Sequence, residues 1–295
     1  MYDIIIIGAG PAGLTSALYA LRANKKVLIF EAKNYGGQII NARKIENYPA
    51  IKEISGVEFA IALYNQVKDL GAEFKFETVL RIDENKNVIT NKNSYKTKAI
   101  IIATGADKKK LGIENEERFV GAGVSYCATC DGNFYKGKNV AVVGSGNNAL
   151  EDTLYLSNLA SKVYLIYTND NINEERLYNK LKQKENIEIF LNSKVKKING
   201  ENNLQSIEII DSENKNSILE IQGLFIDVGQ EPKNEIFKNV VKLNEFGYIK
   251  SVDGVHTEVN GIYIAGDARE KTLRQLTTAV GDGANAATTA IKEMI

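Results

Sequence analysis

Two cysteines three positions apart, Cys127 and Cys130, are the residues of this 295-residue chain best suited to redox chemistry. In a Cys-x-x-Cys pair one thiolate attacks a disulfide, and the second resolves the mixed disulfide that forms. A structural zinc site needs about four ligands, but the chain has no other cysteine and only one histidine, His256. The pattern therefore favours a redox pair and no metal site; an inert buried pair and half of a metal site are the alternatives.

A glycine-rich loop follows the first apolar segment of the chain. Residues 3–7 predict a buried parallel strand, and a helix is expected from the loop to about residue 23. In the loop, Gly8 permits a tight turn, Gly10 lets the backbone approach a pyrophosphate, and Gly13 allows close packing of helix and strand. This order of elements predicts a nucleotide site.

The next strand carries the acid that such a site requires. Residues 27–30 predict a second parallel strand that ends at Glu31, 18 positions after the last glycine of the loop. A carboxylate at this point can bond ribose hydroxyls. The motif alone does not distinguish FAD from NAD.

The same pattern occurs a second time later in the chain. Residues 139–143 predict a strand, Gly144-Ser145-Gly146 follows, and a further strand is expected over residues 163–166. The first glycine precedes the second strand by 19 positions in both units. We therefore predict an α/β fold with two Rossmann-like dinucleotide-binding domains.

Composition excludes several classes of function. Lys+Arg and Asp+Glu both number 37, so the net charge of zero gives no indication of a nucleic-acid partner. No apolar run approaches the ~18 residues of a membrane span. The first residues lead directly into the glycine loop, which leaves no room for a signal peptide, so we expect a cytoplasmic protein.

Four short motifs carry a family resemblance. They are Gly36-Gly37-Gln38, Asn47-Tyr48-Pro49, Cys127-Ala128-Thr129-Cys130-Asp131-Gly132 and Gly266-Asp267. With them, the chain resembles the low-molecular-weight flavin-dependent thioredoxin reductases from end to end. The resemblance implies an FAD domain of residues 1–113 and 242–295, with a second dinucleotide-type domain, residues 114–241, inserted between the two parts. It also implies a homodimer and rotation of the inserted domain. Residues 107–117 form a polar segment, which predicts a crossing linker.

The resemblance further implies which residues bind FAD. The first glycine loop would hold the pyrophosphate and Glu31 the ribose, while Val79 would meet the adenine through its backbone. The flavin ring would be lined by Gly36, Gly37, Gln38, Asn47, Arg274, Gln275 and Leu276. The ribityl–phosphate end would be held by Gly266 and Asp267. The full set is Gly8, Gly10, Pro11, Ala12, Gly13, Glu31, Gly36, Gly37, Gln38, Asn47, Val79, Gly266, Asp267, Arg274, Gln275 and Leu276.

The resemblance also assigns roles around the cysteines. Cys130 would face the flavin and accept its electrons, and Cys127 would attack the disulfide of thioredoxin. Asp131 would transfer the proton that disulfide reduction requires, since no histidine lies nearby in the sequence.

The inserted domain departs from the family pattern. NADPH-dependent members carry His-Arg-Arg-x-x-x-Arg after the second strand, and these arginines bind the 2′-phosphate of NADPH. Here the three arginine positions hold neutral residues, Thr168, Asn169 and Asn173. NADH would require an acid 23 positions after the first glycine, where Glu31 stands in the first unit, but this position is Tyr167. Loop glycines such as Gly144 are then better explained by packing than by nucleotide binding.

In lacking this arginine motif, the chain is similar to the ferredoxin-dependent flavin thioredoxin reductases. We therefore expect reduced ferredoxin as the electron donor and thioredoxin as the acceptor. Basic groups that could steer an acidic ferredoxin are expected on the FAD domain at Lys25-Lys26, Arg43-Lys44 and Lys108-Lys109-Lys110. The alternatives are an NADH- or NADPH-dependent disulfide reductase and a non-catalytic flavoprotein redox sensor.

Overall fold

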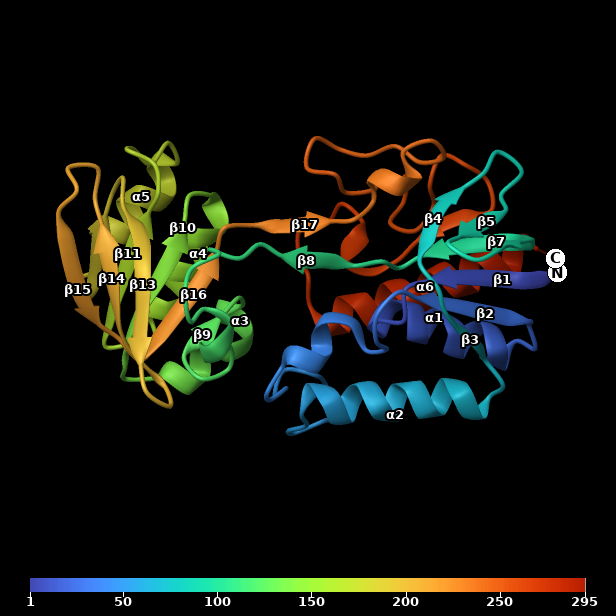
Figure 1. Ribbon diagram of the computed structural model, residues 1–295, viewed down its shortest axis with the longest axis horizontal. Helices are drawn as coiled ribbons and strands as arrows, with labels where there is room; N and C mark the ends of the chain where they lie inside the picture. Colours follow the sequence, from blue (N-terminus) through green and yellow to red (C-terminus); the bar gives the residue numbers. More distant parts are fainter. Residues whose placement is uncertain (295) are drawn as a thin grey trace. The chain divides into compact units, whose positions relative to one another are not determined.

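The computed structural model describes residues 1–294 and divides the chain into two compact units (Figure 1). Unit 1 consists of Met1–Asp107 and the chain from Glu231 onward, and unit 2 is Lys108–Gln230. The expected boundaries lie six residues further along at the first crossing and eleven at the second. The difference arises because the chain passes between the units in two short paired strands, β8 (Ala106–Lys108) and β17 (Gln230–Pro232).

Unit 1 is built on a parallel five-stranded sheet with the order β18-β7-β1-β2-β3. Strand β1 places Ile4 and Ile6 in one apolar cluster and Ile5 and Ile7 in another, so both faces of the sheet are covered. This burial explains why the strand is a continuous apolar run. The strands are β1 (Tyr2–Ile7), β2 (Val27–Glu31), β3 (Glu73–Phe76), β7 (Thr97–Ile102) and β18 (Ile262–Ile264).

Three helices and several short elements complete unit 1. Helix α1 (Pro11–Arg22) packs along α6 (Leu276–Glu293). Helix α2 (Gly56–Asp69) begins directly after Ser55, because the Ser55 hydroxyl and the Glu58 carboxylate cap it reciprocally. The remaining elements are an antiparallel sheet of β4 (Val79–Ile82), β5 (Val88–Thr90) and β6 (Ser94–Tyr95), with 3₁₀ turns at Gly37–Asn41, Glu235–Phe237 and Gly266–Ala268.

Unit 2 repeats the parallel-sheet architecture with the strand order β12-β11-β10-β16-β9. An antiparallel sheet, β13-β14-β15, is added to it. The two sheets share a core around Ala141, Ile166 and Ile207. The strands are β9 (Val124–Ser125), β10 (Asn139–Gly144), β11 (Lys162–Tyr167), β12 (Ile187–Phe190), β13 (Lys194–Gly200), β14 (Leu204–Ile210), β15 (Asn216–Glu220) and β16 (Gly223–Asp227), and the helices are α3 (Ala128–Asp131), α4 (Asn147–Ser157) and α5 (Glu175–Lys182), with 3₁₀ turns at Glu117–Phe119 and Gly132–Tyr135.

The predicted repeat is confirmed residue by residue. In unit 1, Ile7 of β1 lies beside Ile102 of β7, which sets Gly8 beside Ala103. In unit 2, Gly144 of β10 lies beside Asp227 of β16. The first glycine of each loop, Gly8 or Gly144, therefore lies beside the end of the neighbouring strand. Positions in the two glycine loops can thus be compared directly.

Among residues 1–294, none of the helices combines the length and the apolar character required to cross a bilayer.

The single histidine, His256, belongs to a network of side-chain hydrogen bonds. His256 Nδ1 lies 2.6 Å from Asp253, and Nε2 lies 2.6 Å from Glu293 on α6. Glu293 also accepts a hydrogen bond of 2.6 Å from the Tyr263 hydroxyl. Hydrogen bonds to Glu293 and then to Asp253 raise the pKa of His256. Sequence reasoning missed this network because its members are far apart in the chain.

The free energy of unfolding is expected to depend on His256 in a defined pH window. Since its pKa is raised in the folded protein, its contribution is complete below pH ~6.5 and is lost as the pH rises through the raised value. For a partly exposed network this contribution is about 1 kcal/mol or less. Urea unfolding at pH 6 and pH 8.5 should therefore separate His256→Gln from the unsubstituted protein only at pH 6. An equal difference at both pH values would contradict this assignment.

Candidate active site

The two cysteines form a disulfide at the start of helix α3. Their Cα atoms are 5.3 Å apart, Cys127 is half-buried, and Cys130 is exposed. The Ser125 hydroxyl accepts a hydrogen bond of 3.1 Å from the Cys127 backbone N–H and donates one of 2.6 Å to Asp131. Burial raises the pKa of Asp131, and the bond from Ser125 offsets part of this rise. One hydroxyl thus holds both the cysteine backbone and a carboxyl group that is prone to keep its proton.

The first glycine loop has little room for side chains. Gly8 has a φ of +109°, and a Cβ there would lie 2.3 Å from the carbonyl oxygen of Ala103. A Cβ on Gly13 would lie 1.9 Å from the carbonyl oxygen of Gly8. Helix α1 begins after Gly10 with Pro11 in its first turn, and within the described chain no side chain caps this end. Its N–H groups are therefore available to a phosphate.

The acid at the end of β2 holds this loop. Glu31 accepts hydrogen bonds of 2.9 Å from the Ala9 N–H and 2.8 Å from the Lys33 N–H. The Ala9 carbonyl accepts a bond of 2.7 Å from Gly36, and a Cβ on Gly37 would lie 3.1 Å from the Cα of Gly10. The structure thus brings together the first loop, the strand-end acid and the Gly36-Gly37 pair.

Gly266 and Asp267 lie at the same end of unit 1. A Cβ on Gly266, which has a φ of +75°, would lie 2.8 Å from the Cβ of Ala12. The Asp267 Oδ1 atom is buried and, among residues 1–294, has no hydrogen-bond partner, although Lys271 Nζ lies 3.2 Å away as an ion pair. This carboxylate oxygen can therefore accept a hydrogen bond from a ligand hydroxyl.

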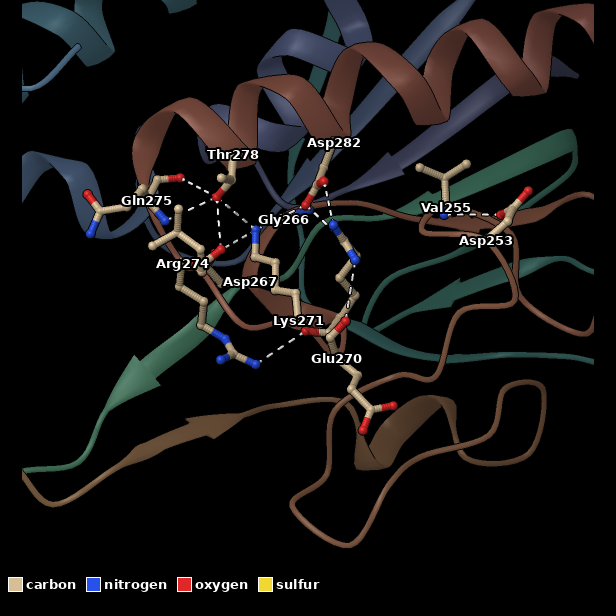
Figure 2. A network of polar contacts seen from close by, with 12 residues as sticks. Asp253, Val255, Gly266, Asp267, Glu270, Lys271, Arg274, Gln275, Thr278 and Asp282 are labelled. Carbon is tan, nitrogen blue, oxygen red and sulfur yellow. Dashed lines mark hydrogen bonds and ion pairs between the residues drawn. The ribbon is translucent and has the colours of Figure 1, made fainter. Parts of the chain in front are cut away.

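A charged network next to Asp267 was not foreseen from the sequence (Figure 2). Asp282 on α6 accepts bonds of 2.9 and 2.8 Å from Arg269, one of 3.0 Å from Lys271, and one of 3.1 Å from the Gly266 N–H. Burial raises the pKa of Asp282, but its hydrogen bond with Arg269 and the charge of Lys271 bring it below the usual value. The only sequence signal was the run of charges after Gly266-Asp267.

The remaining predicted flavin residues fall into two groups. Asn47 donates a hydrogen bond of 3.2 Å to Gln275, which joins two predicted residues 228 positions apart, and Leu276 opens α6 beside them. The Arg274 guanidinium lies 4.1 Å from the centre of the Tyr248 ring.

Gln38 and Val79 have partners elsewhere in unit 1. Gln38 donates a bond of 2.8 Å to Asp107. Val79 is buried in β4 beside Thr90.

The second glycine loop differs from the first where a nucleotide would bind. A Cβ on Gly144 would lie 2.4 Å from the carbonyl oxygen of Asp227, so packing alone requires this glycine, whereas Gly146 faces open space. Tyr167, at the position of Glu31, is buried and donates a hydrogen bond of 2.7 Å to the Ser145 carbonyl. A phenol bonded to the loop thus replaces the carboxylate that would bind ribose.

Residues 2–283 match the family described as Pyridine nucleotide-disulphide oxidoreductase. The chain belongs to this family. It is 40% identical to the thioredoxin reductase of Bacillus subtilis over 293 residues, which cover 97% of the chain and 93% of that protein.

Solved structures agree with this membership. Thioredoxin reductase from Streptococcus pyogenes has a TM-score of 0.95 and 37% identity, with 100% of this chain and 98% of that one covered. A ferredoxin-flavin thioredoxin reductase from Clostridium acetobutylicum has a TM-score of 0.53 and 30% identity, with 99% and 98% covered.

FAD is the cofactor of this pyridine nucleotide-disulphide oxidoreductase, as it is of thioredoxin reductases in the family. Unit 1 fits FAD on its own geometry. The uncapped start of α1 suits the pyrophosphate, the crowded glycines let the backbone approach it, and the buried Asp267 oxygen suits a hydroxyl. When bound, FAD supplies the capacity to pass two electrons to a disulfide.

Proposed function

We propose that this chain is a thioredoxin reductase whose FAD is reduced by ferredoxin rather than by a nicotinamide nucleotide. The observation that carries the proposal is the second glycine loop. It has neutral residues at the three clamp positions, Thr168, Asn169 and Asn173, and the Tyr167 hydroxyl is bonded to the loop. The likeness to the ferredoxin-flavin thioredoxin reductase of Clostridium acetobutylicum supports the same donor.

NADPH as donor is the second candidate. It is favoured by the start of α4, where Gly146 precedes the helix and, within the described chain, no side chain caps the end. That geometry still suits a phosphate. The family description and the likeness to thioredoxin reductase from Bacillus subtilis support the same candidate.

The FAD contacts belong to the proposal. The first glycine loop would receive the pyrophosphate and Glu31 the ribose, while the Asn47–Gln275 pair and Arg274 would border the ring. Since Asp267 Oδ1 is buried without a hydrogen bond, it would accept one from the ribityl chain. From the family resemblance of the sequence, we extend the proposal to a homodimer that acts in the cytoplasm.

The disulfide step follows from the order of the cysteines. Two electrons break the Cys127–Cys130 bond, and two protons complete the thiols. Asp131, whose pKa burial raises, supplies one of these protons. The Cys127 thiolate then attacks the thioredoxin disulfide, Cys130 displaces the thioredoxin thiolate, and the Cys127–Cys130 bond forms again.

The basic groups considered for donor docking do not all lie on the FAD unit. Lys108, Lys109 and Lys110 belong to unit 2, because the crossing comes earlier than the sequence suggested. Lys110 is paired with Glu117, and Lys44 lies 2.7 and 2.8 Å from two glutamates. Since Lys44 and Lys110 are paired with acids and Lys108, Lys109 and Lys110 lie outside unit 1, we assign no docking face from these groups.

The role of Asp267 can be separated from that of its neighbour Asp282. Asp267→Ala is expected to weaken FAD binding at least tenfold, since it removes an acceptor, and to change the apoprotein's free energy of unfolding by less than about 1 kcal/mol. Asp282→Ala leaves Arg269 and Lys271 without their shared acid and should destabilise the apoprotein by about 3 kcal/mol. Flavin titration and urea unfolding measure both quantities. Equal FAD affinity in Asp267→Ala and the unsubstituted protein would remove this contact.

The donor is tested by turnover. Thioredoxin reduction should proceed with photochemically reduced ferredoxin and remain at background level with NADPH or NADH at 100 μM. Omission of thioredoxin and omission of this protein serve as controls. Turnover with NADPH that saturates at micromolar concentration would reverse the choice between the two candidates.

A further inference from the structure

Ser125, to which the proposed mechanism gives no role, joins the two ends of the redox turn α3. Its hydroxyl accepts a hydrogen bond of 3.1 Å from the Cys127 N–H and donates one of 2.6 Å to Asp131 Oδ2. A hydroxyl has one hydrogen to donate, and the Cys127 carbonyl oxygen, at 3.4 Å, is the more distant acceptor. The hydrogen therefore goes to Asp131, and Ser125 connects the residue before α3 with the last residue of α3.

The segment that carries Ser125 is fixed from two sides. Ser125 is 4% exposed and lies in β9, beside Phe225 of β16. The next residue, Tyr126, donates a hydrogen bond of 2.7 Å to Glu116, a buried acid that also accepts one of 2.8 Å from the Gly112 N–H. Ser125 thus stands on a rigid support, whereas α3 is a single turn of four residues.

Reduction of the disulfide removes one of the constraints on this turn. The Cys127–Cys130 bond closes the turn in the oxidised protein. Once that bond is broken, the hydrogen bond of 3.1 Å from the Asp131 N–H to the Cys127 carbonyl remains, together with the two bonds of the Ser125 hydroxyl. Of these three, the bond from Ser125 to Oδ2 is the one that orients the Asp131 carboxyl group. Ser125 therefore holds the acid in place at the stage when protons reach the sulfurs.

We propose that Ser125 is a positioning residue for proton transfer from Asp131 to the cysteines. The inference rests on the proposed function, in which Asp131 is the proton donor. Because Ser125 donates to Oδ2, the proton of the neutral carboxyl group lies on Oδ1. Two electrons break the Cys127–Cys130 bond, this proton passes from Oδ1 to one sulfur, and water supplies the proton for the other. Asp131 is left as a carboxylate, which the Ser125 hydroxyl stabilises.

The bond from Ser125 also affects how Asp131 titrates. Burial raises the pKa of Asp131, and the Ser125 bond lowers it. Two elements pack on α3: the turn Gly132–Tyr135, which has no charged side chain, and α4, which carries Glu151 and Asp152. Without the Ser125 hydroxyl, the acid should keep its proton to higher pH but transfer it more slowly, since it is no longer oriented. A lower rate combined with a higher pKa is the signature of this role.

The test follows loss of the disulfide in the FAD-bound protein after a light pulse that reduces the flavin with deazariboflavin and EDTA. Quenching with N-ethylmaleimide and mass spectrometry give the rate at which the Cys127–Cys130 bond is lost, from pH 5 to pH 9. Asp131→Asn should lower this rate about 100-fold at pH 5 and remove its decline at higher pH. Ser125→Ala should lower the rate at pH 5 about tenfold and displace the decline to higher pH.

A double variant separates positioning from a merely structural role. In the Asp131→Asn background, Ser125→Ala should change the rate less than twofold, because Ser125 acts through Asp131. Ser193→Ala is the matched control: it removes a buried hydroxyl of the same unit that donates to the Leu191 carbonyl, and its rate should equal that of the unsubstituted protein. A tenfold effect of Ser125→Ala in the Asp131→Asn background, or an unaltered rate and pH profile in folded Ser125→Ala, overturns the inference.

Flavin absorbance and circular dichroism verify folding of each variant. If Ser125→Ala does not fold, infrared difference spectra of the unsubstituted protein decide the question. The carboxyl band of protonated Asp131, identified by its loss in Asp131→Asn, should lie at the wavenumber of a hydrogen-bonded carbonyl, and a band at the wavenumber of a free carboxyl group overturns the inference.

Failure of the proposed function would give a different result. An unchanged rate in Asp131→Asn removes the proton donor of the proposed function and this inference with it, whereas a slow Asp131→Asn with a normal Ser125→Ala removes the inference alone. The light pulse replaces the natural electron donor, so the result does not depend on the choice between ferredoxin and NADPH.

Discussion

The Cys130→Ser variant is expected to reduce thioredoxin at least about 10³-fold more slowly than the unsubstituted protein while it keeps its FAD. Without Cys130 the Cys127–Cys130 bond cannot form, so electrons have no disulfide to enter. Flavin binding should persist because the glycine loop, Glu31 and Asp267 all lie in unit 1. Turnover with thioredoxin and the flavin absorbance of the purified variant measure the two parts of this prediction.

The order of the two cysteines can be tested in the same series. In Cys130→Ser, a mixed disulfide between Cys127 and thioredoxin should accumulate, because the resolving thiol is missing. Cys127→Ser should abolish turnover without trapping thioredoxin. Thr129→Ser, a conservative change between the cysteines, serves as the control and should turn over normally. Thioredoxin trapped on Cys130 in the Cys127→Ser variant would reverse the roles assigned to the cysteines.

The second large effect concerns the nicotinamide clamp. A variant with Thr168→Arg, Asn169→Arg and Asn173→Arg is expected to bind NADPH at least about 100-fold more tightly than the unsubstituted protein. Each charged hydrogen bond to the 2′-phosphate contributes ~1.5–3 kcal/mol, and solvent exposure reduces the sum of three. A reduction by about half leaves about 3 kcal/mol, which corresponds to a factor of about 100. Isothermal titration with NADPH and NADH gives the two affinities.

The comparison with NADH isolates the phosphate. The triple variant should gain NADPH affinity much more than NADH affinity, since only NADPH carries the 2′-phosphate. Asn171→Arg, which adds a charge between the clamp positions, controls for general attraction of anions. Equal gains for NADPH and NADH, or an equal gain in Asn171→Arg, would show that these positions do not form the clamp.

Much of the fold was predictable because local signals agree with the packing. The continuous apolar run before Gly8 requires a sheet covered on both faces, and the structure has one. The start of α2 was predictable because the Ser55 cap is a local signal. The unit boundary was harder to predict, since β8 and β17 are three-residue strands that pair across more than 120 positions of chain.

The site was predictable where glycine geometry sets it and not where buried charges do. At Gly8 and Gly13 a Cβ would lie less than 2.5 Å from a backbone oxygen, so only glycine fits at these positions. The glycine pattern is therefore visible in the sequence. Lys271 and Asp282 meet only when the Gly266 turn packs on α6. Pairing of this kind depends on tertiary contacts that residue type and spacing do not encode.

The source of the electrons is the central claim, and anaerobic mixing of the FAD-bound protein with each donor tests it most directly. The measured quantity is the rate at which flavin absorbance is lost within a single turnover. We predict rapid loss with reduced ferredoxin and, over the same interval, none with NADPH or NADH at 100 μM. Rapid bleaching by either nucleotide at micromolar concentration, with slow bleaching by ferredoxin, would contradict the account.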